Sequence, residues 1–264
     1  MNSEGLKQFL ATVGDAVHSV NTICVGLTSV RSGTIEKPED LTISWSSSDP
    51  ATSASKARLF ALRASLVFVE EALLKYLGFL KSCIFADDKL RKALSTEKAA
   101  DKVIEVSKHL PNAEPYWCPM VVLLVRWRNR VVHSSNVGLT VNQKKLLIDN
   151  AQLLKDRHAG IDIDKTINNF GSGQITLKDF TTLIAITVRY VRHIDEELKP
   201  NIYTVDGFFN WLEQRDLIGA YNSVINANGE ATRRRKLKAF INTEFSDISD
   251  ELIERLFKHG PVRL

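Results

Sequence analysis

Three arginines, an asparagine and a histidine lie within eight positions of the segment "MVVLLVRWRNRVVHSSN", which runs from Met120 to Asn136. Arginine binds phosphate oxygens through several N–H groups, and histidine can accept or donate a proton near neutral pH. Together these residue types suit chemistry at a phosphate ester. The segment is also apolar enough to be a buried helix, where a charged side chain needs a partner.

A helical projection separates the polar residues of this segment, because successive residues of an α-helix are rotated by about 100°. The projection places Arg128 near the centre of the apolar face and His133 and Asn129 at its edge, whereas Arg126 and Arg130 point away from it. We therefore expect Arg126 and Arg130 to be solvated. The apolar face itself comprises Trp117, Val121, Leu124, Val125, Val131 and Val132.

A carboxylate partner for Arg128 is available on the strongest amphipathic helix of the sequence, expected at 56–82. Glu70 falls within its leucine stripe, whereas Glu71 points outward. Glu70 and Arg128 are each a charged residue on an otherwise apolar stripe, so the two are candidates to face each other. On the residues alone, the favoured interpretation is a buried structural ion pair that has no catalytic role.

The pattern R-N-x-x-x-H, formed by Arg128, Asn129 and His133, resembles the signature of HEPN domains, a family of small helical bundles in prokaryotic toxins, phage-defence proteins and RNA-guided CRISPR ribonucleases. Arg126 and His133 satisfy a longer spacing, but Trp127 then occupies the slot that a polar residue usually fills. Arg128 is therefore the preferred arginine. The resemblance covers roughly residues 56–199.

The resemblance implies a metal-independent endoribonuclease of a toxin or phage-defence type, with RNA as substrate and no cofactor. The ribose 2′-OH would attack the adjacent phosphate, leaving a 2′,3′-cyclic phosphate and a 5′-OH end. His133 would act as general base or acid, Arg128 would stabilise the transition-state charge, and Asn129 would orient the histidine or the phosphate. Glu70 would support Arg128.

Five residues of straight helix place Arg128 and His133 about 140° apart, too far for both to reach one phosphate easily. The family resemblance implies that two motif helices meet in a composite cleft, so we expect a homodimer, and an antitoxin or defence-system partner to restrain it. The alternative is a non-catalytic HEPN-like module that binds protein or RNA. In that case Glu70 and Arg128 form an internal clamp, and His133 is a helix C-terminal histidine stabilised by the helix dipole.

Helical periodicity dominates the rest of the chain and predicts an all-α protein, an antiparallel HEPN-like bundle. We divide it into an N-terminal helix with a polar linker (1–55), the bundle (56–199) and a small helical C-terminal extension (200–264). The segment 160–174, "GIDIDKTINNFGSGQ", is expected to be a loop. Ser249 is a candidate N-cap for the last helix.

Composition narrows the possible classes of protein. Three cysteines without C-x-x-C spacing argue against a disulfide framework or a cysteine zinc site, and no His and carboxylate cluster predicts another metal. We expect a cytoplasmic protein without a membrane segment or signal peptide. The net charge of +4 permits a nucleic-acid partner. The basic run Arg233, Arg234, Arg235 and Lys236 could bind RNA, although such a run is more often a solvated helix face.

Overall fold

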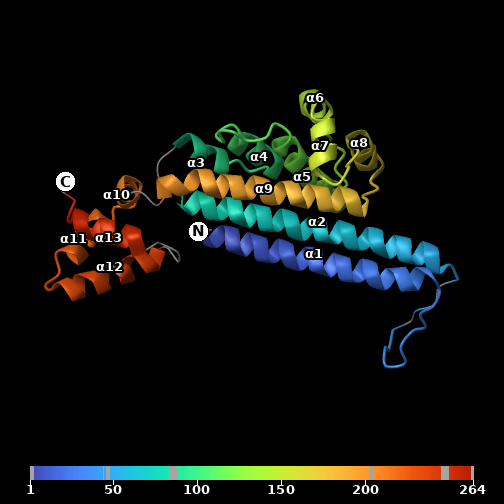
Figure 1. Cartoon of the computed structure of the whole chain (residues 1–264), viewed down its shortest axis with the longest axis horizontal. Helices are drawn as coiled ribbons and strands as arrows, with labels where there is room; N and C mark the ends of the chain where they lie inside the picture. Colours follow the sequence, from blue (N-terminus) through green and yellow to red (C-terminus); the bar gives the residue numbers. More distant parts are fainter. Residues whose placement is uncertain are drawn as a thin grey trace.

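The computed structural model describes residues 3–43, 45, 48–83, 88–202, 205–244 and 250–262. Every regular element in this part of the chain is a helix, which confirms the predicted all-α class (Figure 1). The helices are α1 (Glu4–Arg31), α2 (Pro50–Cys83), α3 (Asp88–Leu94), α4 (Ala99–Ser107), α5 (Trp117–His133), α6 (Val141–Asp149), α7 (Ala151–Arg157), α8 (Ile163–Ser172), α9 (Leu177–Ile202), α10 (Val205–Gln214), α11 (Ile218–Ile225), α12 (Glu230–Glu244) and α13 (Asp250–His259).

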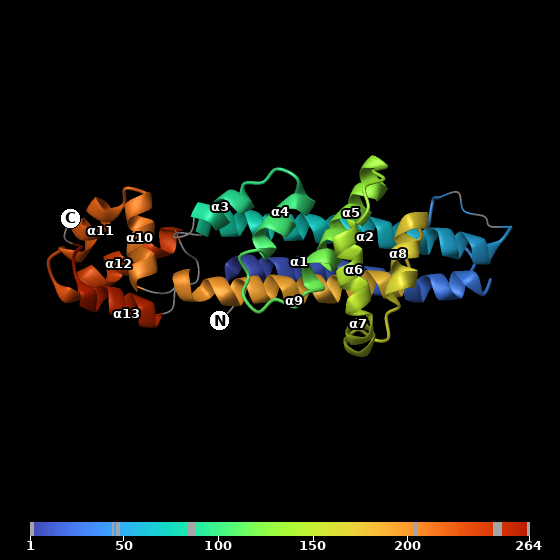
Figure 2. The ribbon, with the colours of Figure 1, turned by 90° about the horizontal axis from the view of Figure 1, so that it is seen from above.

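Four long helices, α1, α2, α5 and α9, form the frame of the larger part of the molecule (Figures 1 and 2). Helices α2 and α9 run in the same direction, and the Tyr76 hydroxyl of α2 donates to Asp195 of α9 over 3.4 Å. Helix α1 runs antiparallel to α2 and packs along it (Figure 1). Helix α5 packs against α9, α4 and α2, so its apolar residues are enclosed by neighbours.

Helix α1 is part of the bundle, although residues 1–55 were expected to be an N-terminal helix and linker. Its apolar residues Leu6, Phe9 and Val13 belong to the same core as α2, α5 and α9. Ser3 caps the helix and donates to the buried carboxylate of Asp195 through its backbone N–H and its hydroxyl. Helix α1 is also long and apolar enough to cross a membrane by length and composition, and 17% of its most apolar window is buried.

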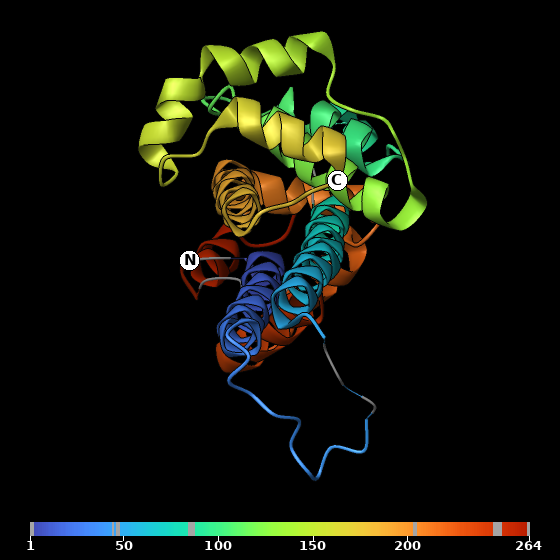
Figure 3. The ribbon, with the colours of Figure 1, turned by 90° about the vertical axis from the view of Figure 1, so that its right-hand side faces the viewer.

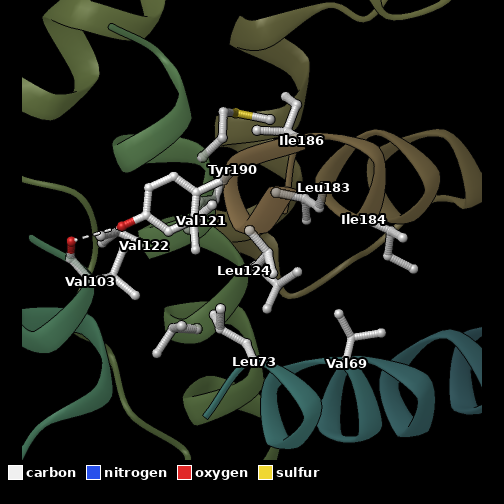
Figure 4. Packing of buried hydrophobic residues seen from close by; sticks show 14 of the residues in the cluster. Val69, Leu73, Val103, Val121, Val122, Leu124, Leu183, Ile184, Ile186 and Tyr190 are labelled. Carbon is white, nitrogen blue, oxygen red and sulfur yellow. Dashed lines mark hydrogen bonds between the residues drawn. The ribbon is translucent and has the colours of Figure 1, made fainter. Parts of the chain in front are cut away.

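The main core lies where α5 passes between α4, α9 and α2 (Figure 4). Val121, Val122 and Leu124 of α5 pack with Leu183 of α9, and their side chains are fully buried. The buried Tyr190 hydroxyl donates to the Val103 carbonyl of α4 over 3.2 Å, which satisfies the one polar atom of its ring. This packing fixes α5, and therefore the candidate site at its end.

Helices α6, α7 and α8 connect α5 to α9 and lie together to one side of the long helices, drawn in yellow-green to yellow in Figure 3. The expected loop at 160–174 is wrong, because residues 163–172 form α8. Asp162 caps its start by accepting from the Lys165 N–H, and Gly173 ends it in the left-handed conformation at φ 71°. Its buried residues Ile163, Thr166 and Phe170 recur at three- and four-residue steps.

Helices α10 to α13 have a second core of their own, built around Phe208, Trp211 and Tyr221. The Tyr221 hydroxyl donates to the carbonyls of Leu256 and Gly260, each over 3.2 Å, which fastens the end of α13 to α11. Because this core shares no buried residue with the bundle core, helices α10 to α13 pack as a unit. The expected N-cap Ser249 lies outside the described residues.

Candidate functional site

The candidate site lies at the end of α5, where the helix stops directly after His133. Ser134 adopts the left-handed conformation at φ 52°, and its backbone N–H is donated to the Asn129 carbonyl. This turn leads the chain away from the helix axis, so no following helical turn covers the last residues. His133 is therefore exposed, whereas Arg128 and Asn129 are half-buried.

The three motif side chains contact one another within the single chain. Arg128 Nη1 donates to Asn129 Oδ1 over 3.2 Å, and it lies 3.0 Å from His133 Nε2. Because a guanidinium has only donors, His133 Nε2 accepts this hydrogen bond, and the neutral imidazole carries its proton on Nδ1. Arg128 thus holds the histidine in one tautomer and one orientation.

This contact corrects the expectation that one helix separates Arg128 and His133 too widely. A projection angle of about 140° describes Cα positions and ignores the length and direction of side chains. Helical side chains lean toward the N-terminus, so the imidazole of His133 extends back over the turn that precedes it. The long arginine side chain covers the remaining distance, so a second subunit is not needed to bring the two groups together.

Glu70 is the acidic partner of Arg128, as the two apolar stripes predict. Its Oε2 lies 3.3 Å from Arg128 Nε, and the glutamate is 1% exposed. The two atoms form an ion pair without the alignment of a hydrogen bond. Burial raises the pKa of the Glu70 carboxyl, Arg128 opposes that rise, and Glu71 adds to it. Glu70 therefore pairs with Nε of the guanidinium, while His133 contacts Nη1.

The expectation that Arg126 and Arg130 are solvated is wrong, because Arg126 is buried and Arg130 is bound to a carbonyl of α8. Arg126 is only 9% exposed, and its guanidinium forms no hydrogen bond or ion pair with any described residue. Burial lowers the pKa of Arg126, and the charge of Asp101 opposes that shift. The projection failed because residues 119–127 are buried on every side by α4, α9 and α2.

Arg130 fastens α8 to the end of α5. Its Nη2 donates to the Gly171 carbonyl over 2.8 Å, and its guanidinium lies 5.4 Å from the centre of the Phe170 ring. Arg63 of α2, which the sequence did not single out, donates to the neighbouring Gly173 carbonyl over 2.7 Å. Both cations thus neutralise the negative C-terminal end of α8. No local signal identifies Arg63, because its partner is 110 residues away.

The same cluster leaves groups available for a ligand. Arg128 Nη2 makes no hydrogen bond to any residue that the structure describes, so both of its N–H groups can bind an oxyanion. His133 is exposed beside it. Val132, which was expected on the buried face, is 46% exposed, and Val137 and Val141 beyond the helix are exposed as well. The motif therefore opens onto an apolar surface.

Half of the basic run of α12 has intramolecular partners. Arg234 forms ion pairs with Glu230 and Glu254 and lies 4.3 Å from the centre of the Phe257 ring. Arg233 lies over the same ring at 5.3 Å. Arg235 and Lys236 are exposed. Of the four predicted RNA contacts, two are thus used to pack α12 against α13.

Among the described residues, no group of three His, Cys, Asp or Glu side chains is arranged to hold a metal ion. No protein-family model, curated protein or solved structure matches this chain. The functional argument therefore depends on the geometry at the end of α5 and on the resemblance of its motif.

Proposed function

We propose that this protein is a metal-independent endoribonuclease of the HEPN type, whose catalytic residues are Arg128, Asn129 and His133. The observation that carries the proposal is the distance of 3.0 Å between Arg128 Nη1 and His133 Nε2. It joins a phosphate-binding cation and a proton-transferring group at an exposed helix end. Transesterification of RNA needs these two functions at one phosphate.

The chemistry follows from the roles of the three side chains. Arg128 binds a non-bridging oxygen of the scissile phosphate through Nη2 and then releases His133 Nε2. The free nitrogen accepts the proton of the ribose 2′-OH as its oxygen forms a bond to phosphorus. The bond from phosphorus to the 5′ oxygen breaks, and that oxygen takes a proton from solvent. The products are a 2′,3′-cyclic phosphate and a 5′-OH.

Exposed apolar residues next to the motif support the homodimer. Val132, Val137 and Val141 lie within nine positions of one another and are 46%, 62% and 82% exposed. Surfaces of this kind beside a polar cluster are typical of protein contacts. We propose that two copies meet there in the cytoplasm and that a partner protein restrains the enzyme, as for a toxin or phage-defence effector.

A non-catalytic HEPN-like module is the second candidate, and the Glu70 contact favours it. Arg128 is bound on three sides, by Glu70, Asn129 and His133, so the cluster can also act as a clamp between α2 and α5. Such a protein would bind RNA or a protein partner without cleaving it. Its function would not require His133 to be exposed.

An RNA-cleavage assay in EDTA, comparing wild type with His133→Ala, tests the proposal. We expect wild type alone to cleave and to leave 2′,3′-cyclic phosphate ends, with a loss of about 10² to 10⁴ in rate for the variant. The exposed position of His133 means that the variant should fold, which circular dichroism checks. Equal cleavage by both proteins would overturn the assignment. RNA binding without cleavage by either would support the non-catalytic module.

A further inference from the structure

A shallow groove lies between the first turns of α2 and the start of α9, and no motif residue lines it. Its volume is about 500 Å³, and Lys56 and Arg58 of α2 form its charged wall. Apolar side chains of Leu59, Leu62 and Ile175 form the floor. No acidic residue lines it, so the groove presents positive charge over an apolar base.

The two cations of this groove have no partner among the residues that the structure describes. Neither Lys56 nor Arg58 forms a hydrogen bond or ion pair with another described residue, and Arg58 Nε is buried without an acceptor. The charge of Lys56 is only the smallest of the causes that lower the pKa of Asp49, which is exposed. An arginine nitrogen that is buried without an acceptor is costly, and a phosphate oxygen would satisfy it.

A stripe of α2 connects this groove to the motif. Lys56, Phe60, Arg63 and Glu70 recur at intervals of four, three and seven residues, so they lie along one face of the helix. Lys56 and Glu70 are about 21 Å apart along the helix axis. Because Glu70 contacts Arg128, the stripe ends at the candidate catalytic cluster.

An exposed aromatic ring lies among the charges of this stripe. Phe60 is 74% exposed, whereas Phe68, which is 62% exposed, is rotated by about 80° from Phe60 around the helix axis and lies off the stripe. Exposed rings between cations are the arrangement that binds single-stranded nucleic acid, because bases stack on the rings while phosphates pair with the cations. The part of α2 from Pro50 to Val69 contains Lys56, Arg58 and Arg63 and no acid, and of these only Arg63 is bound to another described residue, the Gly173 carbonyl.

From these observations we infer that the first half of α2 is a binding track for single-stranded RNA, which anchors the substrate in the groove at Lys56 and Arg58 and leads it past Phe60 to the motif. The inference rests on the proposed function, since it names the form of its substrate. Stacking on Phe60 gives sequence-tolerant binding, because every base has a face that can stack. The enzyme therefore prefers strands long enough to span both the groove and the motif.

The test measures binding of a 2′-O-methyl oligonucleotide of about ten nucleotides, which cannot be cleaved, at several salt concentrations. The variant Lys56→Gln/Arg58→Gln is compared with Lys75→Gln/Lys81→Gln, which removes the same charge from the same helix beyond Glu70. We expect the groove variant to bind about tenfold more weakly. Its plot of log affinity against log salt should be less steep by about 1.4, at roughly 0.7 for each lost phosphate contact. The control should match wild type, and a dinucleotide should not distinguish the variants.

Two single substitutions keep the test independent of folding. Lys56 is exposed, so Lys56→Glu should fold, and it should weaken binding more than Lys56→Gln. Phe60→Ala should lower the affinity about tenfold through lost stacking, without changing the mass of the protein in solution. If Phe60→Ala instead changes the mass and leaves RNA affinity intact, Phe60 is a subunit contact and the track is overturned.

The outcomes separate this inference from the proposed function. Cleavage that requires His133, with equal affinity and salt dependence for the groove and control variants, would overturn the track and leave the ribonuclease intact. RNA binding that depends on the groove, without any cleavage, would support the track and overturn the proposed catalysis. A wild-type protein that does not bind the oligonucleotide would overturn both.

Discussion

The end of α5 and the start of α12 carry similar runs of basic residues, yet their side chains meet different neighbours. In α5, the guanidinium of Arg128 joins a buried carboxylate to an exposed histidine. In α12, Arg234 is paired with two exposed carboxylates and covers a phenylalanine ring. The comparison shows that a dense run of cations is not a binding signal by itself. What matters is whether a polar group near the cations remains available to a ligand.

Replacing the guanidinium of Arg128 should show the largest difference between the two regions. In Arg128→Lys the charge remains, but a single ammonium group cannot contact Glu70, Asn129 and a phosphate together. We expect single-turnover cleavage to slow by about 10² to 10³. Arg235→Gln, which removes an exposed cation of α12, is the matched control and should cleave at the wild-type rate. An unchanged rate in Arg128→Lys would mean that the guanidinium does not bind the phosphate.

A substitution in α12 should instead lower the stability of the fold and leave the cleavage rate unchanged. Arg234→Gln removes two exposed ion pairs and a cation–π contact, which together stabilise the fold by about 1 kcal/mol. We expect urea unfolding of the full chain to show a loss of this size, with unchanged cleavage. Arg235→Gln should leave the free energy of unfolding within about 0.5 kcal/mol of wild type. A loss of cleavage in Arg234→Gln at full stability would give α12 a functional role.

The titration of Glu70 should make the stability of the fold depend on pH, and we expect this effect to be smaller than those of the two arginine substitutions. Burial raises the pKa of this carboxyl, so the folded chain holds the proton more tightly than the unfolded chain does. The stabilisation is present at low pH and is lost as the pH rises through the raised pKa. In Glu70→Gln this titration is absent. The melting temperature of wild type, relative to the variant, should therefore rise as the pH is lowered from about 7 toward 4.5. A difference that shrinks instead would mean that Arg128 outweighs burial.

Several elements of this molecule could be predicted because their signals are local. The leucine stripe of α2 and the apolar run of α5 are each long and periodic, so both helices and the contact between Glu70 and Arg128 follow from projections. Helix α8 was missed because its residues are largely polar. Its stability depends on the caps at Asp162 and Gly173 and on packing of Phe170 against Trp127, whose ring centres are 5.5 Å apart.

The candidate site was only partly predictable. The residue types and spacing identified Arg128, Asn129 and His133, but a projection of Cα positions separated two side chains that are in contact. It also placed Arg126 in solvent, since one helix viewed alone does not show that α4 packs against its other face. The roles of Arg63 and Arg130 depend on the carbonyls of α8, which lie far away in the sequence.

The sequence by itself determined that the chain is helical, which faces of α2 and α5 are apolar, and that a charged residue interrupts each of them. These properties follow from periodicity, which acts over a few turns of one helix. Only the tertiary structure decided which arginines are buried, which carbonyls they bind, and that Arg128 reaches both Glu70 and His133. Those outcomes depend on how helices distant in the sequence pack, because burial and pairing of a charge are set by its surroundings in space.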